Sequence, residues 1–279
     1  MIDKILFYFA SYPTVRYAAL SLMLISLSAS LLGVTLVLKR YSMIGDGLSH
    51  VTFGSASIAT VLGLTTPIYL SLPLTVAAAV LLLKIRSSTR IKGDAAIAMV
   101  SAGSLAFGYI LLNLFPDGSA VTTDACANLF GSGILGIGIE DVILCTALSL
   151  AVLVIFILFY NKIFAVTFDE SFSSATGVRT EAYNTLIAIV TGVIIVVAMN
   201  MVGALLISAL IVFPALSAMR VFKTFRSVTV CSALISVICA AAGLVISLAA
   251  STPVGSTVVV ADIVLFAIFS LIGAVRKRA

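Results

Sequence analysis

Charged side chains are scarce in this sequence of 279 residues, in which aspartate, glutamate, lysine and arginine together supply 10% of the positions. Apolar residues supply 62%, and the mean hydropathy is +1.27. A soluble domain is typically about a quarter charged and about half apolar. The composition therefore excludes an ordinary water-soluble fold and predicts that most of the chain lies in a lipid bilayer.

Several motifs are absent as well. The chain has a single histidine and no GxxxxGK[ST] phosphate loop, which excludes multi-histidine metal hydrolase motifs and ATP binding through that loop. The four cysteines form no CxxC pair, and three stand in apolar runs, where we expect them to act as small packing residues. We expect no enzyme here, and any energy from ATP must come through a partner.

The formal net charge of +5 does not indicate a nucleic-acid partner. The basic residues occur in small clusters separated by apolar stretches, so we expect them to orient the chain in the membrane. The first seventeen residues lack the basic start, short apolar run and small-residue cleavage site of a secretory signal. We expect no cleaved signal.

Long apolar runs are what the sequence has in abundance. One helical crossing needs about 20 such residues, and the runs lack the alternation of an outer-membrane barrel, so helices are predicted. The predicted segments are 17–38, 43–63, 66–85, 94–113, 141–160, 182–200, 201–219, 228–250 and 256–275. The predicted fold is one all-α polytopic membrane domain over residues 1–279, with eight crossings if 201–219, interrupted by Gly203 and Pro214, does not span.

The basic residues predict the orientation. When the segments alternate across the bilayer, only Lys4 and Arg16 fall on one side. The side that carries the most basic residues is normally cytoplasmic, so the N-terminus is predicted outside and the C-terminus inside. The residues on the predicted cytoplasmic side are Lys39, Arg40, Lys84, Arg86, Arg90, Lys92, Lys162, Arg179, Arg220, Lys223, Arg226, Arg276, Lys277 and Arg278.

Two predicted loops are long enough to do more than connect helices. The external loop, residues 114–140, combines acidic residues with many glycines and is a candidate vestibule or docking surface. The cytoplasmic loop, residues 161–180, contains FDESFSSATGV, in which Asp169 and Glu170 precede a short predicted helix ended by Gly177. Such a helix on the membrane surface could receive force from a partner.

Asp46 and His50 are the polar residues that most need an explanation. Their i, i+4 spacing puts both side chains on one helical face, about 6 Å apart. If the membrane begins near Arg40, Asp46 lies about 9 Å and His50 about 15 Å deep, where an ionisable group costs at least about 2.5 kcal/mol. The pair predicts a site for manganese, iron(II) or zinc on a transport pathway. The alternative is a mutual hydrogen bond that only packs helices.

Asp262 is a second acidic residue inside an apolar run, in VVVADIVLF of the last segment. It is a candidate secondary pathway residue or ligand. The alternative for Asp262 is a hydrogen bond to a serine or backbone group of a neighbouring helix.

Five stretches in order along the chain resemble one known family. They are LVLKRYSMIGDGLSHVTFGSASIATVLG, IKGDAAIAMVSAGSLAFGYIL, LFGSGILGIGIEDV, FDESFSSATGVRTEAYNTL and VGALLISALIVFPALSAM. The first resembles the segment centred on GDALSH in the permeases of bacterial zinc and manganese ABC importers, and the others resemble that family's later segments. Gly47 stands where the family commonly has alanine, and Asp262 is outside the family pattern.

The resemblance implies an assembly and a fold. It implies two permease copies, two cytoplasmic ATP-binding subunits and an extracytoplasmic metal-binding protein in a bacterial cytoplasmic membrane, with a fold similar to the type II importers of cobalamin and haem. Asp46 and His50 would line the pathway of zinc or manganese, with iron as a further option. No cofactor is expected to stay bound, and ATP would act only through the partner. The residues implied to couple the ATPase are Phe168, Asp169, Glu170, Ser173 and Gly177.

Other functions stay open at this point. An ion-gradient-driven secondary transporter could also use intramembrane Asp and His without an ATPase. A multi-pass enzyme or scaffold could use the pair for acid–base or packing work. The sequence leaves open which metal is carried and whether its site lies within one subunit or on a dimer axis.

Overall fold

The computed structural model describes residues 8, 11–64, 66–88, 93–115 and 138–278, so most of the predicted external loop lies outside the described residues. Nine helices of 18 residues or more make up most of this part of the chain. They are α2 (Pro13–Leu38), α3 (Ile44–Val61), α4 (Ile68–Ser88), α5 (Gly93–Leu114), α7 (Ile139–Leu158), α10 (Thr180–Val202), α11 (Ala204–Val221), α12 (Phe225–Ala250) and α13 (Val254–Arg278). Two short helices, α8 (Tyr160–Phe168) and α9 (Glu170–Ala175), occupy the predicted cytoplasmic loop.

The predicted all-α polytopic fold is confirmed. Each predicted apolar segment is a helix whose ends agree within a few residues. Among the described residues, seven helices are long and apolar enough to cross a membrane: α2, α5, α7, α10, α11, α12 and α13. Helix α4 is apolar over its described stretch Ile68–Lys84, and α3 contains Asp46 and His50 together with many serines, threonines and glycines.

The segment with the weakest prediction forms a continuous helix. Gly203 separates α10 from α11 and has φ 88° and ψ 160°, a conformation open to glycine and strained for other residues. One residue therefore suffices to reverse the chain. Helix α11 continues through Pro214 and contains four of the largest fully buried side chains, Leu206, Ile207, Leu210 and Ile211.

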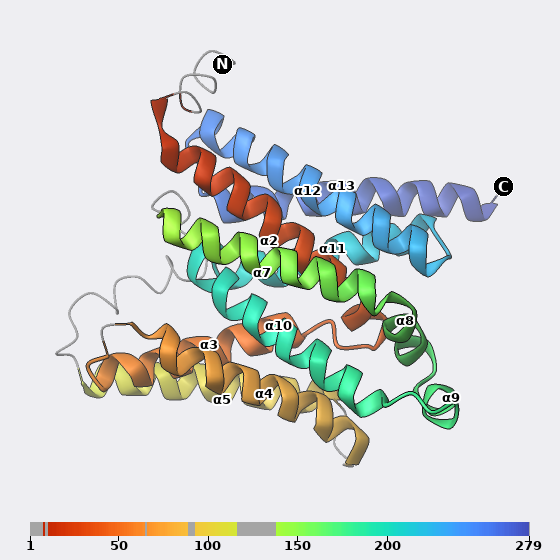
Figure 1. Cartoon of the computed structure of the whole chain (residues 1–279). Helices are drawn as coiled ribbons and strands as arrows, with labels where there is room; N and C mark the ends of the chain where they lie inside the picture. Colours follow the sequence, from red (N-terminus) through yellow and green to blue (C-terminus); the bar gives the residue numbers. More distant parts are fainter. Residues whose placement is uncertain (1–7, 9–10, 65, 89–92, 116–137, 279) are drawn as a thin grey trace.

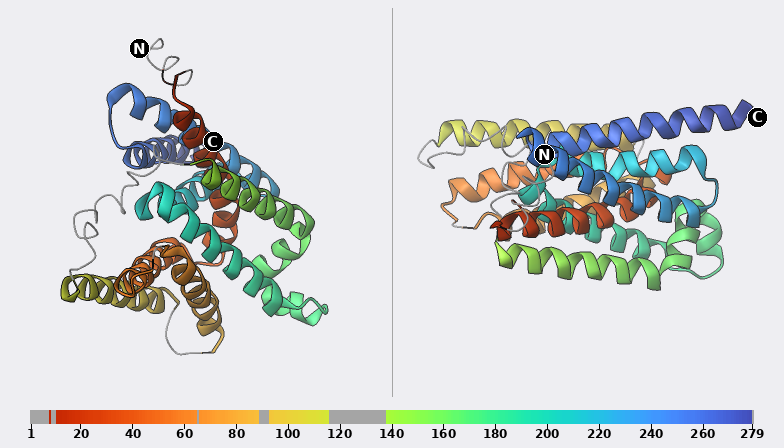
Figure 2. Two further views of the ribbon diagram at one scale, coloured as in Figure 1. Left: turned by 60° about the vertical axis from the view of Figure 1, so that its left-hand side comes forward. Right: turned by 90° about the horizontal axis from the view of Figure 1, so that it is seen from above.

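Helix α11 lies at the centre of the bundle and packs against α2, α3, α10, α12 and α13. Helices α3, α4 and α5 form one group, α2, α12 and α13 form another, and α10 and α11 lie between them (Figure 1). Seen from above, the long helices run in roughly the same direction (Figure 2, right). Buried hydroxyls join neighbouring helices, as when Ser28 Oγ of α2 lies 2.7 Å from Ser149 Oγ of α7.

The outer helices present apolar side chains to their surroundings. Met99 of α5, Leu150 of α7 and Leu271 of α13 are each more than 60% exposed. Exposure of such an apolar surface to water is unfavourable, whereas lipid or a second subunit can cover it.

The helix ends that carry most of the basic residues gather at one end of the bundle. The last residues of α2, α11 and α13 and the first residues of α10 and α12 lie at the right of Figure 1. Helices α8 and α9 lie at the same end (Figure 1). That this end faces the cytoplasm stays a prediction from the distribution of basic residues.

Candidate functional site

Asp46 and His50 meet in the first turns of α3. Met43 precedes the helix as its N-cap, and Asp46 lies in its first turn. The His50 Nε2 atom is 3.6 Å from the Asp46 Oδ1 atom, and the two side chains are 17% and 37% exposed. The predicted pairing on one helical face is therefore present in the structure.

The separation of these two atoms suits a shared cation. Nitrogen and oxygen ligands lie about 2.0–2.2 Å from zinc, so two of them on one tetrahedral ion are about 3.4 Å apart. The observed 3.6 Å is close to that value and too long for a strong hydrogen bond. A cation can enter between the two side chains with little movement.

The backbone of α3 is fixed on both sides of the pair. Gly45 faces α11, where a Cβ atom would lie 3.1 Å from Cδ1 of Ile211, and Gly47 faces α5, where a Cβ would lie 2.5 Å from Cγ2 of Ile97. These glycines stand about 100° to either side of Asp46 around the helix. The pair thus projects from the side of α3 that lies between its two close neighbours.

The hydroxyl groups of α3 are engaged within the helix. Ser49 Oγ donates to the Gly45 carbonyl, Thr52 Oγ1 to Leu48 and Ser57 Oγ to Phe53, at 2.8–2.9 Å. No cluster of three or more His, Cys, Asp or Glu occurs in the described part of the chain. Asp46 and His50 are therefore the side-chain ligands that α3 offers, and an ion bound there needs further ligands.

Asp262 lies apart from this pair. It is 1% exposed on α13, with the thiol of Cys239 of α12 beside it. Neither carboxylate oxygen has a hydrogen-bonding nitrogen or oxygen partner among the described residues. Helix α11 packs against both α3 and α13 and lies between them (Figure 1). The structure does not join Asp262 to Asp46 and His50.

The predicted coupling segment forms a small helical unit. Asp169 caps α9 by accepting a hydrogen bond from the Phe172 amide at 2.8 Å, and Gly177, with φ 85°, follows its end. Ser173 is buried, whereas Phe168 and Phe172 are 58% and 66% exposed. The unit thus has a buried side and an exposed aromatic side.

The unit is attached to the bundle through aromatic rings and hydrogen bonds. Ring centroids of Phe164 and Phe168 in α8 lie 5.3 and 6.0 Å from that of Phe225 at the start of α12. Asn184 Nδ2 of α10 donates to Glu170 Oε1 at 2.7 Å. Sequence reasoning missed both attachments because the contacting residues are far apart in the chain.

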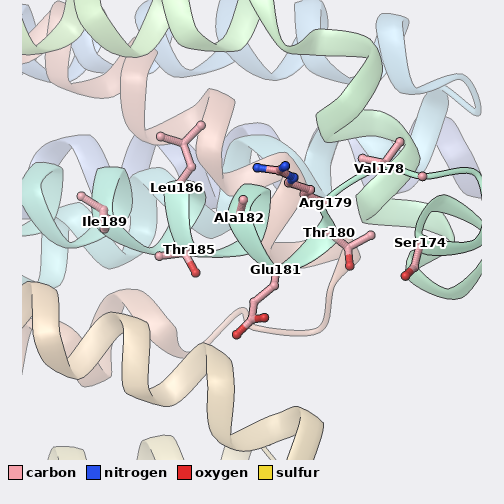
Figure 3. Close-up of a pocket in the computed structure, with 10 residues that line it drawn as sticks. Ser174, Val178, Arg179, Thr180, Glu181, Ala182, Thr185, Leu186 and Ile189 are labelled. Atoms are coloured by element: carbon pink, nitrogen blue, oxygen red, sulfur yellow. The ribbon is translucent and has the colours of Figure 1, made fainter.

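Two hollows flank the start of α10. An open groove of about 850 Å³ runs from Ser174 and Gly177 along the first turns of α10 to Ile189, with Glu181 turned towards α4 (Figure 3). A second cavity of about 500 Å³ is lined by Lys39, Tyr41, Val80, Leu83, Lys84, Glu170, Glu181, Asn184 and Thr185.

Comparison with known proteins identifies the family. Residues 11–273 match the family model of the ABC 3 transport family. The chain is a member of the ABC 3 transport family. The predicted relationship to ABC importer permeases is thereby confirmed.

Individual relatives agree over nearly the whole chain. This chain is 26% identical over 261 residues to the manganese import system permease protein ScaB of Streptococcus parasanguinis. The match covers 94% of this chain and 91% of that protein. The chain is 27% identical over 252 residues to the high-affinity zinc uptake system membrane protein ZnuB of Haemophilus influenzae, covering 89% and 94%. The solved structure of PsaBC from Streptococcus pneumoniae in complex with Fab matches with a TM-score of 0.83 and 25% identity, covering 96% of this chain and 95% of the other.

Proposed function

We propose that this ABC 3 family member is the membrane-spanning subunit of an ATP-driven importer of a divalent transition metal, zinc or manganese, with iron as a further option. The observation that carries the proposal is the Asp46–His50 pair, spaced for one cation on a helix whose flanking faces are packed. The full-length similarity to permeases named for manganese and zinc supports the choice of cargo.

A second copy of the chain completes the site in this proposal. Zinc commonly takes four ligands, and this part of α3 offers two side chains. The 37% exposure of Asp46 leaves room for ligands from outside the subunit. Two copies related by a two-fold axis would supply two carboxylates and two imidazoles.

The exposed side of α9 is the proposed docking point of the ATP-binding subunit. Phe168 and Phe172 supply apolar contact area, and the adjoining groove along α10 (Figure 3) extends the surface. The N-capped helix and the Phe225 contacts link this surface firmly to the bundle. ATP binding and hydrolysis in the partner would move α9 and switch which side of the membrane the pathway faces.

Transport starts outside in this scheme, where an extracytoplasmic binding protein releases its ion to the permease dimer. Two weak protein ligands per subunit suit a pathway, because an ion that binds too tightly cannot leave. The permease then supplies the path and the gate.

Uptake of radioactive zinc and manganese tests the proposal. The chain is expressed with its ATP-binding subunit and binding protein in cells that lack their own high-affinity importers. We expect ATPase-dependent accumulation of one metal, its loss in His50→Ala and Asp46→Asn, and its persistence in Asp262→Asn, a matched change of another intramembrane aspartate. Uptake that survives without the ATPase would indicate a secondary carrier. No uptake despite verified membrane assembly would indicate the enzyme or scaffold alternative.

A further inference from the structure

Lys39 occupies an unusual place for a residue predicted to lie in a cytoplasmic cluster. It is the C-cap of α2 and only 7% exposed. Burying an ammonium group is unfavourable unless polar partners compensate. Its Nζ atom donates to Oδ1 of Asn184, near the start of α10. The contact joins residues 145 positions apart in the sequence.

Asn184 extends this contact to the coupling unit. Its carbonyl end accepts from Lys39, and its amide end donates to Glu170 Oε1 at 2.7 Å. The half-buried amide therefore bridges a buried cation at the end of α2 and an anion at the first position of α9. Both hydrogen bonds involve a charged group, which makes them stronger than neutral ones and more directional than a bare charge contact.

In the other direction along the chain, Lys39 is followed by the turn that leads into α3, the helix that carries Asp46 and His50. Arg40 has a left-handed backbone with φ 62°, and the Tyr41 amide donates back to the Leu36 carbonyl at 2.8 Å, which closes a tight Schellman-type turn. Helix α3 begins at Ile44, and Asp46 is its third residue. Only a short, hydrogen-bonded turn thus separates Lys39 from the proposed cation site.

This turn is stiff, whereas the space beside it is open. Tyr41 is 4% exposed, and its hydroxyl donates to the Leu83 carbonyl of α4 at 3.4 Å. The cavity of about 500 Å³ lies between the turn, α4, α9 and α10. A stiff turn passes on a displacement instead of absorbing it, and the cavity gives the turn room to move.

We propose that Lys39, Asn184 and Glu170 form a coupling relay that transmits movement of α9 to the start of α3, and so to Asp46 and His50. Lys39 and Asn184 are positioning residues that act through this turn and do not bind the ion. The inference rests on the proposed function, because movement of α9 is attributed there to the ATP-binding subunit.

The relay is tested by measuring metal uptake and ATP hydrolysis on the same proteoliposomes, which contain the chain with its ATP-binding subunit and are supplied with metal-loaded binding protein. Asn184→Leu keeps the approximate size of the side chain and removes both hydrogen bonds. We expect hydrolysis to stay within about twofold of the wild type and metal taken up per ATP to fall about tenfold, a typical size for coupling between sites.

Two further variants separate coupling from general stability. Lys84→Gln breaks the Lys84–Glu181 ion pair of 3.2 Å from the α4 side, at the border of the same cavity and outside the proposed docking groove. Because both side chains are largely exposed, at 69% and 80%, this control should leave uptake per ATP unchanged. Asn184→Asp alone places a second carboxylate beside Glu170, and we expect it to lower the amount of metal taken up per ATP. Adding Glu170→Gln restores a donor to that carboxylate and should recover uptake per ATP.

An unchanged ratio of uptake to hydrolysis in Asn184→Leu would overturn the relay and leave the importer function intact, as would failure of the double variant to recover the ratio. ATP hydrolysis without metal uptake in the wild type would instead contradict the proposed function. In that case a spin label at Met43, which is 54% exposed at the start of α3, decides the relay. A nucleotide-dependent change in its mobility that disappears in Asn184→Leu supports the relay, and a change that persists overturns it.

Discussion

At the residue scale, the two proposed ligands meet their surroundings differently. The Asp46 carboxylate is 37% exposed, and the His50 imidazole one turn further along α3 is 17% exposed. The carboxylate is therefore the more accessible of the two ligands, whereas the imidazole lies deeper in the bundle from the predicted cytoplasmic end. Coordination requires a neutral imidazole, because the protonated ring has no free lone pair.

Acidification should consequently weaken metal binding by the purified chain. Protons compete with the ion for the lone pair of the His50 imidazole. We expect zinc affinity, measured by equilibrium dialysis in nanodiscs, to be lower in acidic than in neutral buffer. An affinity that does not change with pH would exclude a metal–imidazole bond.

The buried carboxyl of Asp262, unlike Asp46 and His50, is expected to contribute little to metal uptake. It lies across α11 from the pair and has no nitrogen or oxygen hydrogen-bond partner among the described residues. Asp262→Asn should keep metal uptake within about twofold of the wild type, because asparagine has nearly the same shape and sites without shared partners act independently. A loss of uptake as large as that of Asp46→Asn, at equal membrane abundance, would make Asp262 a pathway residue.

Sequence spacing predicted some of these residues and not others. Asp46 and His50 are neighbours on any helix, so their i, i+4 spacing was sufficient. The role of Lys39 could not be predicted, since its partner Asn184 lies 145 residues away and neither residue stands out in its own segment. Local periodicity carries no information about such contacts.

At the element scale, the close packing of α3 on α5 holds the candidate site in place. A Cβ atom on Gly54 would lie 2.7 Å from the Ser104 carbonyl oxygen of α5, a backbone atom that cannot rotate away. The glycine therefore permits the two helices to approach closely, as small residues do in membrane helix pairs.

Gly54→Ala should separate these helices and destabilise the protein by about 1–3 kcal/mol, the usual cost of overpacking. Gly103→Ala in α5 is a matched control, because nothing lies within 4 Å of its added Cβ. That control should be neutral or stabilising by up to about 1 kcal/mol, since alanine favours helix. Thermal unfolding in detergent measures both changes, and equal effects at the two glycines would contradict the packing argument.

Hydropathy predicted the ends of helices that are separated by polar loops. It could not locate the junction of two helices that follow each other directly. Gly203 and Pro214 made segment 201–219 the weakest prediction. The structure uses Gly203 as a one-residue reversal and keeps α11 helical through Pro214. Hydropathy cannot distinguish a tight glycine turn between two helices from a broken crossing, because both interrupt the same apolar pattern.

At the scale of the whole molecule, the direction of the chain in the membrane decides which end of the bundle meets which partner. The helix ends that carry most of the basic residues, together with α8 and α9, gather at one end of the bundle (Figure 1). If that end is cytoplasmic, α9 meets the ATP-binding subunit and the opposite end meets the binding protein.

Single-cysteine labelling tests this orientation in a cysteine-free background. Leu62 follows α3 at the opposite end of that helix from Asp46 and is 66% exposed, so Leu62→Cys should react with a membrane-impermeant thiol reagent in intact cells. Ser174→Cys in the exposed part of α9 should react only after permeabilisation. The reverse pattern would contradict the predicted orientation.

Coordination of the cargo by Asp46 and His50 is tested most directly by X-ray absorption of zinc bound to the purified full-length chain in nanodiscs. We predict a shell of nitrogen and oxygen ligands that includes imidazole scattering, with the imidazole contribution lost in His50→Ala and retained in Asp262→Asn. A zinc shell that is the same in the wild type and in His50→Ala would contradict the proposed metal site.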